Sequence, residues 1–283
     1  MNERPAREPL DAAAAKAPRL GVVTACNDRA TLERNLMRSP MLAAGDVPVE
    51  IVEGAPSAAV AYNRGMDAPA MAEVDLVIFA HQDVFLPQGW DALLRLRAAQ
   101  TAARDPDWAM LGCYGVAMDV MGRGPVWSSS IGAIVGRPPP EPEPVQSYDE
   151  MLMVMRRGCG LRFDESLPGF HMYGTDIVQE AAARGLRCYA AALPAIHNDG
   201  FHPNLGPDFA AAYHHVRRKW RARLPLWTPV TKVSPWGLAL RRSVRANLRT
   251  IEARRAMAQP PERDPLFYAE LCGWLDVTPS AAE

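Results

Sequence analysis

The chain has 283 residues, of which 31 are Lys or Arg and 32 are Asp or Glu; its formal net charge is -1 and 48% of its residues are hydrophobic. This composition excludes a globally disordered chain, and 5 cysteines are too few for a disulfide scaffold. No apolar run is long enough to span a membrane, and the first twenty residues do not form a secretory signal, so we expect a cytoplasmic protein.

Residues 1–18 are rich in Ala, Pro and charge and predict a flexible leader. The apolar, β-branched run at 20–25 then predicts a strand, and the amphipathic segment 31–39 predicts a helix. A second strand is expected to end at Glu53, with a helix over 56–71. The fold therefore begins at Arg19 with alternating strands and helices.

The run DLVIFA at 75–80 is almost continuously apolar, as in a central parallel strand that is covered on both faces. A helix is expected over 89–100, and the proline-rich segment 137–144 predicts an exposed connection at a subdomain change. Residues 163–176 are expected to form a loop. Further strands are predicted at 109–119, 126–136 (or a hairpin), 148–157 (or a short helix) and 188–199, and a helix over 177–185 that is ended by Gly185.

This alternation predicts an α/β fold with a parallel or mixed sheet between helices. In open sheets of this kind, ligands bind at the carboxyl ends of the strands. Four polar clusters follow predicted strands and should share one crevice. They are 25–28, Glu53, 81–83 and 197–199.

The most informative cluster is His81-Gln82-Asp83, directly after the buried run. A carboxylate in this place is held rigidly, and Mg²⁺ or Mn²⁺ prefers such oxygen ligands together with substrate phosphates. Asp83 could instead cap the next helix or turn, with its two neighbours bonded to loop amides. Both interpretations stay open on the residues alone.

The chain resembles the glycosyltransferases of the GT-A fold, and more narrowly the bacterial family-2-like group that includes a streptomycin-biosynthesis-type domain. The resemblance covers about residues 19–205 and implies a catalytic domain there, with HQD in the place of the acidic DxD motif that holds a divalent metal and the donor diphosphate. HQD keeps only one carboxylate, Asp83. His197, which ends the last strand, matches a further metal ligand of related enzymes, and His202 is the weaker alternative.

The resemblance also implies a nucleotide-sugar donor, with UDP as the expected nucleotide. The matching donor-binding positions are Thr24, Cys26, Asn27, Glu53, Asn63, Arg64, His81, Gln82 and Asp83. Arg64 suits a pyrophosphate because a guanidinium pairs with phosphate oxygens. Asn63 and Arg64 would equally suit an exposed helix face.

Asp176 matches the general base of the superfamily, at the start of a helix after a loop. Plain N-capping is the alternative for this residue, although Thr175 could cap as well. Trp127, His171 and Tyr173 are candidates for contact with the sugar or acceptor, and Trp127 would also suit a packed core.

Residues 206–283 predict a mostly helical extension. Its stretch 216–256 has twelve basic residues and one acidic residue, a net charge of +11, which leaves 19 basic and 31 acidic residues, or -12, elsewhere. Packing on the domain, homo-oligomerisation and peripheral membrane contact are the expected roles, in that order. No nucleic-acid motif accompanies the stretch, and no nucleic-acid partner is expected.

Three functions are open at this point. The favoured one is an inverting glycosyltransferase that uses a divalent metal and acts on an unknown glycan or small-molecule hydroxyl. The second is a catalytically degenerate protein that binds a nucleotide sugar or glycan, as the lost carboxylates of HQD would allow. A metallohydrolase using His81, Asp83 and His197 is the third.

Overall fold

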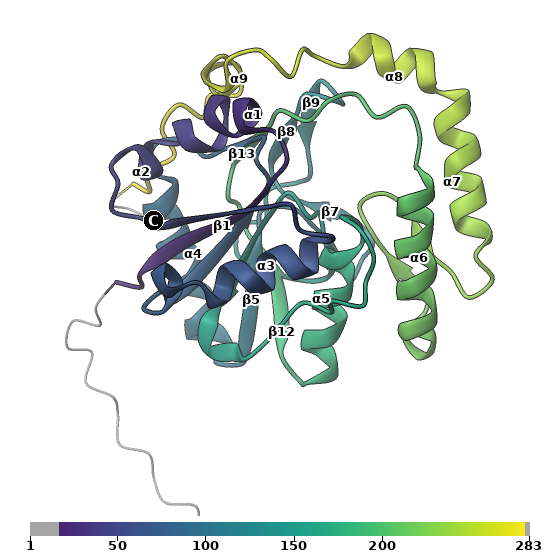
Figure 1. The fold of residues 1–283 in the computed structure, drawn as a ribbon, viewed down its shortest axis with the longest axis horizontal. Coiled ribbons are helices and arrows are strands. Elements are labelled where there is room, and N and C mark those ends of the chain that lie inside the picture. The colour runs from purple at the N-terminus through teal and green to yellow at the C-terminus, as the bar shows by residue number, and fades with distance from the viewer. Residues whose placement is uncertain (1–16, 281–283) are drawn as a thin grey trace, which may run out of the picture.

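The computed structural model describes residues 17–280 as a mixed α/β fold around a nine-stranded sheet (Figure 1). The predicted leader therefore lies outside the described residues, except for its last two positions. In sheet order the strands are β2 (Val49–Glu53), β1 (Leu20–Cys26), β3 (Leu76–Ala80), β11 (Leu152–Arg156), β5 (Trp108–Gly112), β12 (Arg187–Ala190), β10 (Glu143–Tyr148), β6 (Gly115–Ala117) and β7 (Gly122–Arg123). The mixed α/β architecture predicted from the sequence is confirmed.

The central strand β3 is buried along its whole length, as its apolar sequence predicts. It pairs in parallel with β1 on one side, and β1 in turn pairs in parallel with β2. Its other neighbour, β11, is antiparallel, so the sheet is mixed, one of the two forms expected for it. The parallel trio places the carboxyl ends of β1, β2 and β3 at the same edge of the sheet.

Helices cover both faces of this sheet (Figure 1). Buried side chains of α3 (Ala58–Asp67), α5 (Tyr173–Ala183) and α6 (Pro207–Lys219) share one core. Those of α1 (Arg29–Arg34), α2 (Pro40–Ala43) and α4 (Trp90–Arg104) share the core on the other face. The sheet thus separates two apolar layers, and its strands contribute side chains alternately to each.

Two small sheets complete the fold. One has the order β4 (Val84–Phe85), β13 (Ala195–His197), β8 (Val126–Ser128) and β9 (Ala133–Val135), and it begins just beyond the end of β3. The other pairs β14 (Leu226–Trp227) with β15 (Lys232–Val233). The segment 126–136 is therefore a hairpin, one of the two forms expected for it.

Three expectations about elements were wrong in their bounds. The helix predicted over 31–39 is broken at Asn35, whose side chain donates a hydrogen bond to the carbonyl of Thr31, and a 3₁₀ turn follows. Glu143 and Pro144 belong to β10, so the irregular connection ends at Pro142, and it leads from β9 in the four-stranded sheet to β10 in the nine-stranded sheet. The predicted last strand is two strands, β12 and β13, in different sheets.

The C-terminal extension packs on the domain through part of its length. Tyr213, Leu226, Val233 and Leu240 are buried in the same core as α3 and α5. Its remaining helices are α7 (Leu238–Arg249), α8 (Ile251–Met257) and α9 (Pro265–Leu271), of which α9 contacts β13. Within residues 17–280, no helix has both the length and the apolar character needed to cross a membrane.

Candidate functional site

The candidate site forms where β3 ends. His81, Gln82 and Asp83 follow this strand directly and lead into β4, which pairs with β13. The pairing places His197 opposite Val84 and so brings the end of β13 to the end of β3. The predicted convergence of strand ends is confirmed, because β2 also ends beside β1 and the loop after β1 is bonded to Gln82.

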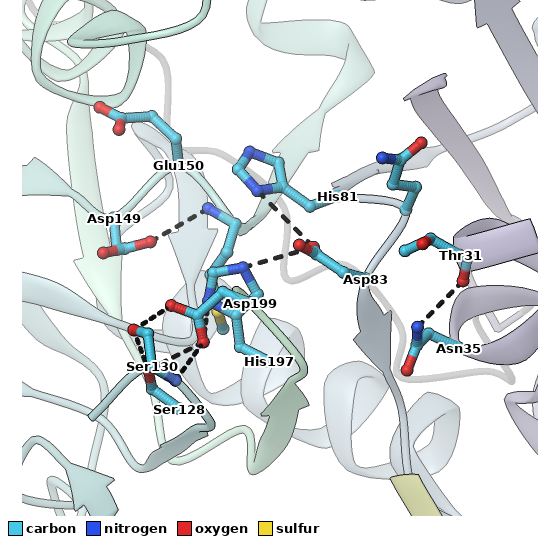
Figure 2. A network of polar contacts seen from close by, with 12 residues as sticks. Thr31, Asn35, His81, Asp83, Ser128, Ser130, Asp149, Glu150, His197 and Asp199 are labelled. Atoms are coloured by element: carbon cyan, nitrogen blue, oxygen red, sulfur yellow. Dashed lines mark hydrogen bonds and ion pairs between the residues drawn. The ribbon is translucent and has the colours of Figure 1, made fainter. Parts of the chain in front are cut away.

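The side chains of His81, Asp83 and His197 face one another (Figure 2). Each offers one ligand atom, and these atoms lie within 4.8 Å of one another. His197 Nε2 is 3.3 Å from Asp83 Oδ1, and His81 Nδ1 is 4.0 Å from the same oxygen. Asp83 Oδ1 is buried and accepts no well-oriented hydrogen bond from the described residues. A buried carboxylate oxygen in that condition is costly unless a cation neutralises it.

The electrostatics of the cluster are dominated by burial and by mutual charge. Burial lowers the pKa of His197, but the carboxylates of Asp199 and Asp83 outweigh it and raise this pKa to about 10. Burial raises the pKa of Asp83, yet His197 and His81 bring it below its usual value. The pKa of His81 is lowered, chiefly by burial. Asp83 is therefore ionised beside a protonated His197, whose proton a divalent cation would replace.

Tyr173 determines which nitrogen of His81 is available. Its hydroxyl oxygen lies 2.7 Å from His81 Nε2, and the same hydroxyl donates to the carbonyl of Glu150 at 3.2 Å. In the arrangement where the hydroxyl proton serves that bond, the hydroxyl oxygen accepts from His81 Nε2–H. The lone pair of His81 is then on Nδ1, the nitrogen that faces Asp83.

Asp199 is the second support of the cluster, behind His197. Its Oδ1 lies 3.9 Å from His197 Nδ1 and accepts hydrogen bonds from Ser128 Oγ at 2.9 Å and from the Ser130 backbone N–H at 3.1 Å. The hydroxyl of Ser130 donates to Oδ2 (Figure 2), and that of Ser129 donates to the Asp199 carbonyl at 2.6 Å. Three consecutive serines thus fix this carboxylate against the histidine.

The donor set fits a divalent cation. Two imidazoles and one carboxylate suit first-row ions such as Mn²⁺ better than Ca²⁺, which prefers oxygen ligands alone. Each histidine has an outer neighbour: the Tyr173 hydroxyl is hydrogen-bonded to His81, and the Asp199 carboxylate lies 3.9 Å from His197 Nδ1. Outer partners of this kind are usual at metal sites. Three protein ligands would leave further coordination positions on the metal ion for substrate oxygens.

Unlike His81 and Asp83, Gln82 is hydrogen-bonded to the loop that follows β1. Its Oε1 accepts hydrogen bonds from the backbone N–H groups of Asn27 and Asp28, both at 3.0 Å, and its Nε2 donates to Asn27 Oδ1 at 2.6 Å. Asp28 in turn caps α1. These bonds hold the loop after β1 beside the loop after β3, and the side chains of Gln82 and Asn27 are bonded to each other.

The other positions predicted to bind the donor differ in exposure. Thr24 and Cys26 are buried in β1, whereas the exposed Glu53 forms an ion pair with Arg29 at 2.9 Å. Arg64 is exposed on α3. Glu53 and Arg29 therefore present polar groups at the carboxyl edge of β1 and β2, while the side chains of Thr24 and Cys26 pack inside.

Asn63 and Trp127 both have partners within the protein. Asn63 donates to the carbonyl of Phe163 at 2.9 Å and accepts from its N–H at 3.1 Å, which fixes α3 to the loop before α5. The Trp127 ring stacks on Tyr268 with ring centroids 5.1 Å apart, in a small core formed with α9. His171, partly exposed, lies 3.2 Å from Asp208.

Asp176 lies in the first turn of α5, almost completely buried. Lys219 Nζ is 2.9 Å from its Oδ2, and Trp220 Nε1 donates to its Oδ1 at 2.7 Å. Lys219 also contacts Asp164 and Glu180, at 2.6 and 2.8 Å. Burial raises the pKa of Asp176 in spite of Lys219 and Trp220.

Sequence reasoning did not assign the observed roles of three contributors to the site. It named His81 as a donor contact, and as a metal ligand only in the hydrolase alternative, although its spacing of two residues from Asp83 was a signal for a shared ligand. It placed Asp199 in the polar cluster 197–199 without an individual role, although the serine triplet in VWSSS could have suggested a carboxylate partner. Glu150 had no visible signal: its backbone accepts from Tyr173, its Oε1 accepts from Gly174 N–H at 3.3 Å, and burial raises its pKa to about 8.

No family model matches the chain. A protein described as "ATP synthase subunits region ORF 6" from Fuscovulum blasticum is 31% identical in an alignment of 155 residues that covers 51% of this chain and 60% of that protein. The chain thus spans less than two thirds of this relative's length.

Solved structures show weak likeness. GalNAc-T7 with UDP, GalNAc and Mn²⁺ is 13% identical, with 73% of this chain and 50% of that chain covered and a TM-score of 0.49. The inositol-1-phosphate CTP transferase from T. maritima is 13% identical, with 64% and 89% covered and a TM-score of 0.37. A197 from STIV is 17% identical, with 67% and 91% covered and a TM-score of 0.41. At these scores the likenesses carry no argument about function.

Proposed function

We propose that this chain is a glycosyltransferase that moves a sugar from a nucleotide-activated donor, with UDP as the first nucleotide to test, to an acceptor hydroxyl. The cluster of His81, Asp83 and His197 carries the proposal. It lies at the carboxyl edge of β1, β2 and β3, where open α/β sheets bind nucleotides. A cluster that could hold a metal ion at that edge suits transfer from a nucleoside diphosphate, because a cation there would neutralise the leaving group.

The reaction would be a single displacement with inversion. The acceptor oxygen forms a bond to the anomeric carbon while the bond from that carbon to the diphosphate oxygen breaks. The nucleoside diphosphate leaves with the electron pair, and the acceptor proton passes to a carboxylate of the protein. A Mn²⁺ ion held by His81, Asp83 and His197 would neutralise charge on the leaving diphosphate.

The buried carboxyl group of Asp176 and the partly buried one of Glu150 are candidates for the proton acceptor. Asp176 is the one that the sequence predicts, but it is held by Lys219 and Trp220, and both partners stabilise its charged form. As a base it would have to exchange Lys219 for the acceptor. Glu150 makes its side-chain bond to a backbone N–H, and its pKa of about 8 is close to the value that suits a general base at neutral pH.

A nucleotide-sugar-binding protein without catalysis is the second candidate function. The observation that favours it is the ion pair of Asp176 with Lys219, which occupies the predicted base. Donor binding with no release of nucleoside diphosphate would identify this function.

The test is calorimetry with UDP and a panel of UDP-, GDP- and dTDP-sugars, with and without Mn²⁺, followed by an assay for nucleoside diphosphate release. We expect binding that requires the metal in the wild-type chain and is lost in Asp83→Asn. His202→Ala is the matched control, because His202 is exposed and outside the cluster. Metal-independent binding, or none with any donor, would contradict the proposal.

A further inference from the structure

The helix α7 presents four arginines to solvent on one side. Arg241, Arg242, Arg245 and Arg249 are all exposed, and at 100° per residue they fall within one arc of about 100°. We name these four residues the α7 arginine face. Leu240, on the opposite side of the helix, is buried and packs into the main core, so the orientation of this face is fixed by the fold.

The α7 arginine face has no acidic partners within the described residues. Arginines elsewhere in the chain, such as Arg123 and Arg162, form ion pairs with carboxylates. None of the four arginines of the face forms an ion pair or a side-chain hydrogen bond with any residue in 17–280. Since α7 itself contains no Asp or Glu, its positive field is uncompensated along the whole helix.

Large apolar side chains are exposed beside these arginines. Trp236, just before α7, is 83% exposed, and Leu238 and Leu248 are 48% and 53% exposed. By their positions both leucines fall on the side of the helix that carries the arginines. Exposed Trp and Leu side chains next to Arg side chains without acidic partners are typical of protein surfaces that lie in the interface of a bilayer.

We infer that the α7 arginine face, with Trp236, Leu238 and Leu248, docks this protein on an anionic lipid bilayer. The arginines would bind lipid phosphates and the apolar side chains would enter the headgroup region. The charge distribution would also orient the molecule, because the rest of the chain outside 216–256 carries a net charge of -12 and would be repelled by the same surface. In Figure 1, α7 lies at the periphery of the molecule, beyond α6, where a flat surface can reach it.

The interleaved apolar side chains favour a bilayer over a nucleic acid. A phosphate backbone would use the arginines but would leave Trp236 and the two leucines without burial. A bilayer accommodates both kinds of side chain at once, which is why we commit to lipid. The inference is independent of the sugar transfer proposed above.

The test is co-sedimentation of the full chain with sucrose-loaded vesicles, either of phosphatidylcholine alone or of equal parts phosphatidylcholine and phosphatidylglycerol. We expect binding to the anionic vesicles only, weakened by salt. The variant Arg241→Gln/Arg245→Gln/Arg249→Gln should lower the partition coefficient on the order of 100-fold. Trp236→Ala should lower it several-fold and leave the salt dependence unchanged.

A matched control removes the same charge elsewhere. Arg97→Gln/Arg104→Gln/Arg184→Gln takes three arginines from α4 and from the end of α5 and should leave vesicle binding within about twofold of wild type. Equal loss in both triple variants would show a nonspecific charge effect and overturn the inference. So would absence of vesicle binding together with tight binding of a short RNA or DNA duplex that depends on the α7 arginine face.

Discussion

The hydroxyl of Tyr173 lies 2.7 Å from Nε2 of His81, while Nδ1 of the same ring faces Asp83. A residue at the start of α5 thus orients a side chain at the end of β3. The two positions are far apart in the sequence, and the bond between them prepares Nδ1 as a ligand atom before any ion arrives.

Replacing this hydroxyl should weaken metal binding without removing a ligand. We expect Tyr173→Phe to lower Mn²⁺ affinity by about 10- to 100-fold, the usual cost of losing an outer partner of a metal-bound histidine. Calorimetric titration with Mn²⁺ measures it. Tyr62→Phe is the control, because its hydroxyl is 3.4 Å from that of Tyr173 and does not contact His81. Equal affinity in wild type and Tyr173→Phe would disprove the orienting role.

Removing a ligand should have a larger effect. His197→Ala leaves one imidazole and one carboxylate, so we expect the loss of measurable Mn²⁺ binding at micromolar concentrations, whereas His202→Ala should bind like wild type. Electron paramagnetic resonance of free Mn²⁺ gives the bound fraction directly. If both variants bound equally, His197 would not be a ligand.

The two candidate bases are separable by substitution. If Glu150 accepts the proton, Glu150→Gln should lower kcat by about 10²- to 10⁴-fold at unchanged donor affinity, and Asp176→Asn should lower it less. If Asp176 is the base, the order reverses. Donor affinity measured by calorimetry controls for misfolding in both variants. Full activity in each single variant would exclude both residues.

The pair of Asp105 and Arg187 should make stability depend on pH. Asp105 accepts hydrogen bonds from Arg187 Nε at 2.6 Å and from Tyr189 at 2.7 Å, and these bonds, that of Arg187 first, lower the pKa of Asp105 to about 2. A depressed pKa in the folded state stabilises the fold above the unfolded-state pKa near 4, and this contribution is lost as pH falls toward 2.

At neutral pH, Asp105→Asn should therefore lower the free energy of unfolding by about 1–3 kcal/mol, as for a lost hydrogen bond to a charged group. The difference between variant and wild type should shrink between about pH 4 and pH 2. Urea unfolding across this range measures it. A difference that stays constant with pH would show that the ionisation of Asp105 is not involved.

Much of the sheet and of the site edge could be predicted because the signals are local. A continuous apolar run such as β3 must be a buried strand, and the polar residues that end it must lie at the sheet edge. His197 was predicted on the same reasoning. Its distance from Asp83, however, depends on β4, which is two residues long and has no periodicity to detect.

The remaining features depend on partners from distant parts of the chain. Trp127 is covered by Tyr268 of α9, and Asp176 is paired with Lys219 of α6, and neither partner can be inferred from the residues around these two positions. The break at Asn35 likewise results from a side-chain bond that competes with the helix. The local sequence pattern predicts helices and strands, whereas the residues that surround a given side chain are determined only by the assembled fold.

The place of β11 beside β3 has a consequence for synthesis. The ribosome makes β3 early, but its second neighbour in the sheet emerges about seventy residues later. Until then the backbone N–H and C=O groups along one edge of this apolar strand are unpaired. Nascent chains arrested before Leu152 would expose that edge to chaperones or to aggregation. His81 donates its backbone N–H to the carbonyl of Met151 as β11 begins, so the candidate site takes shape in the same step that closes the sheet.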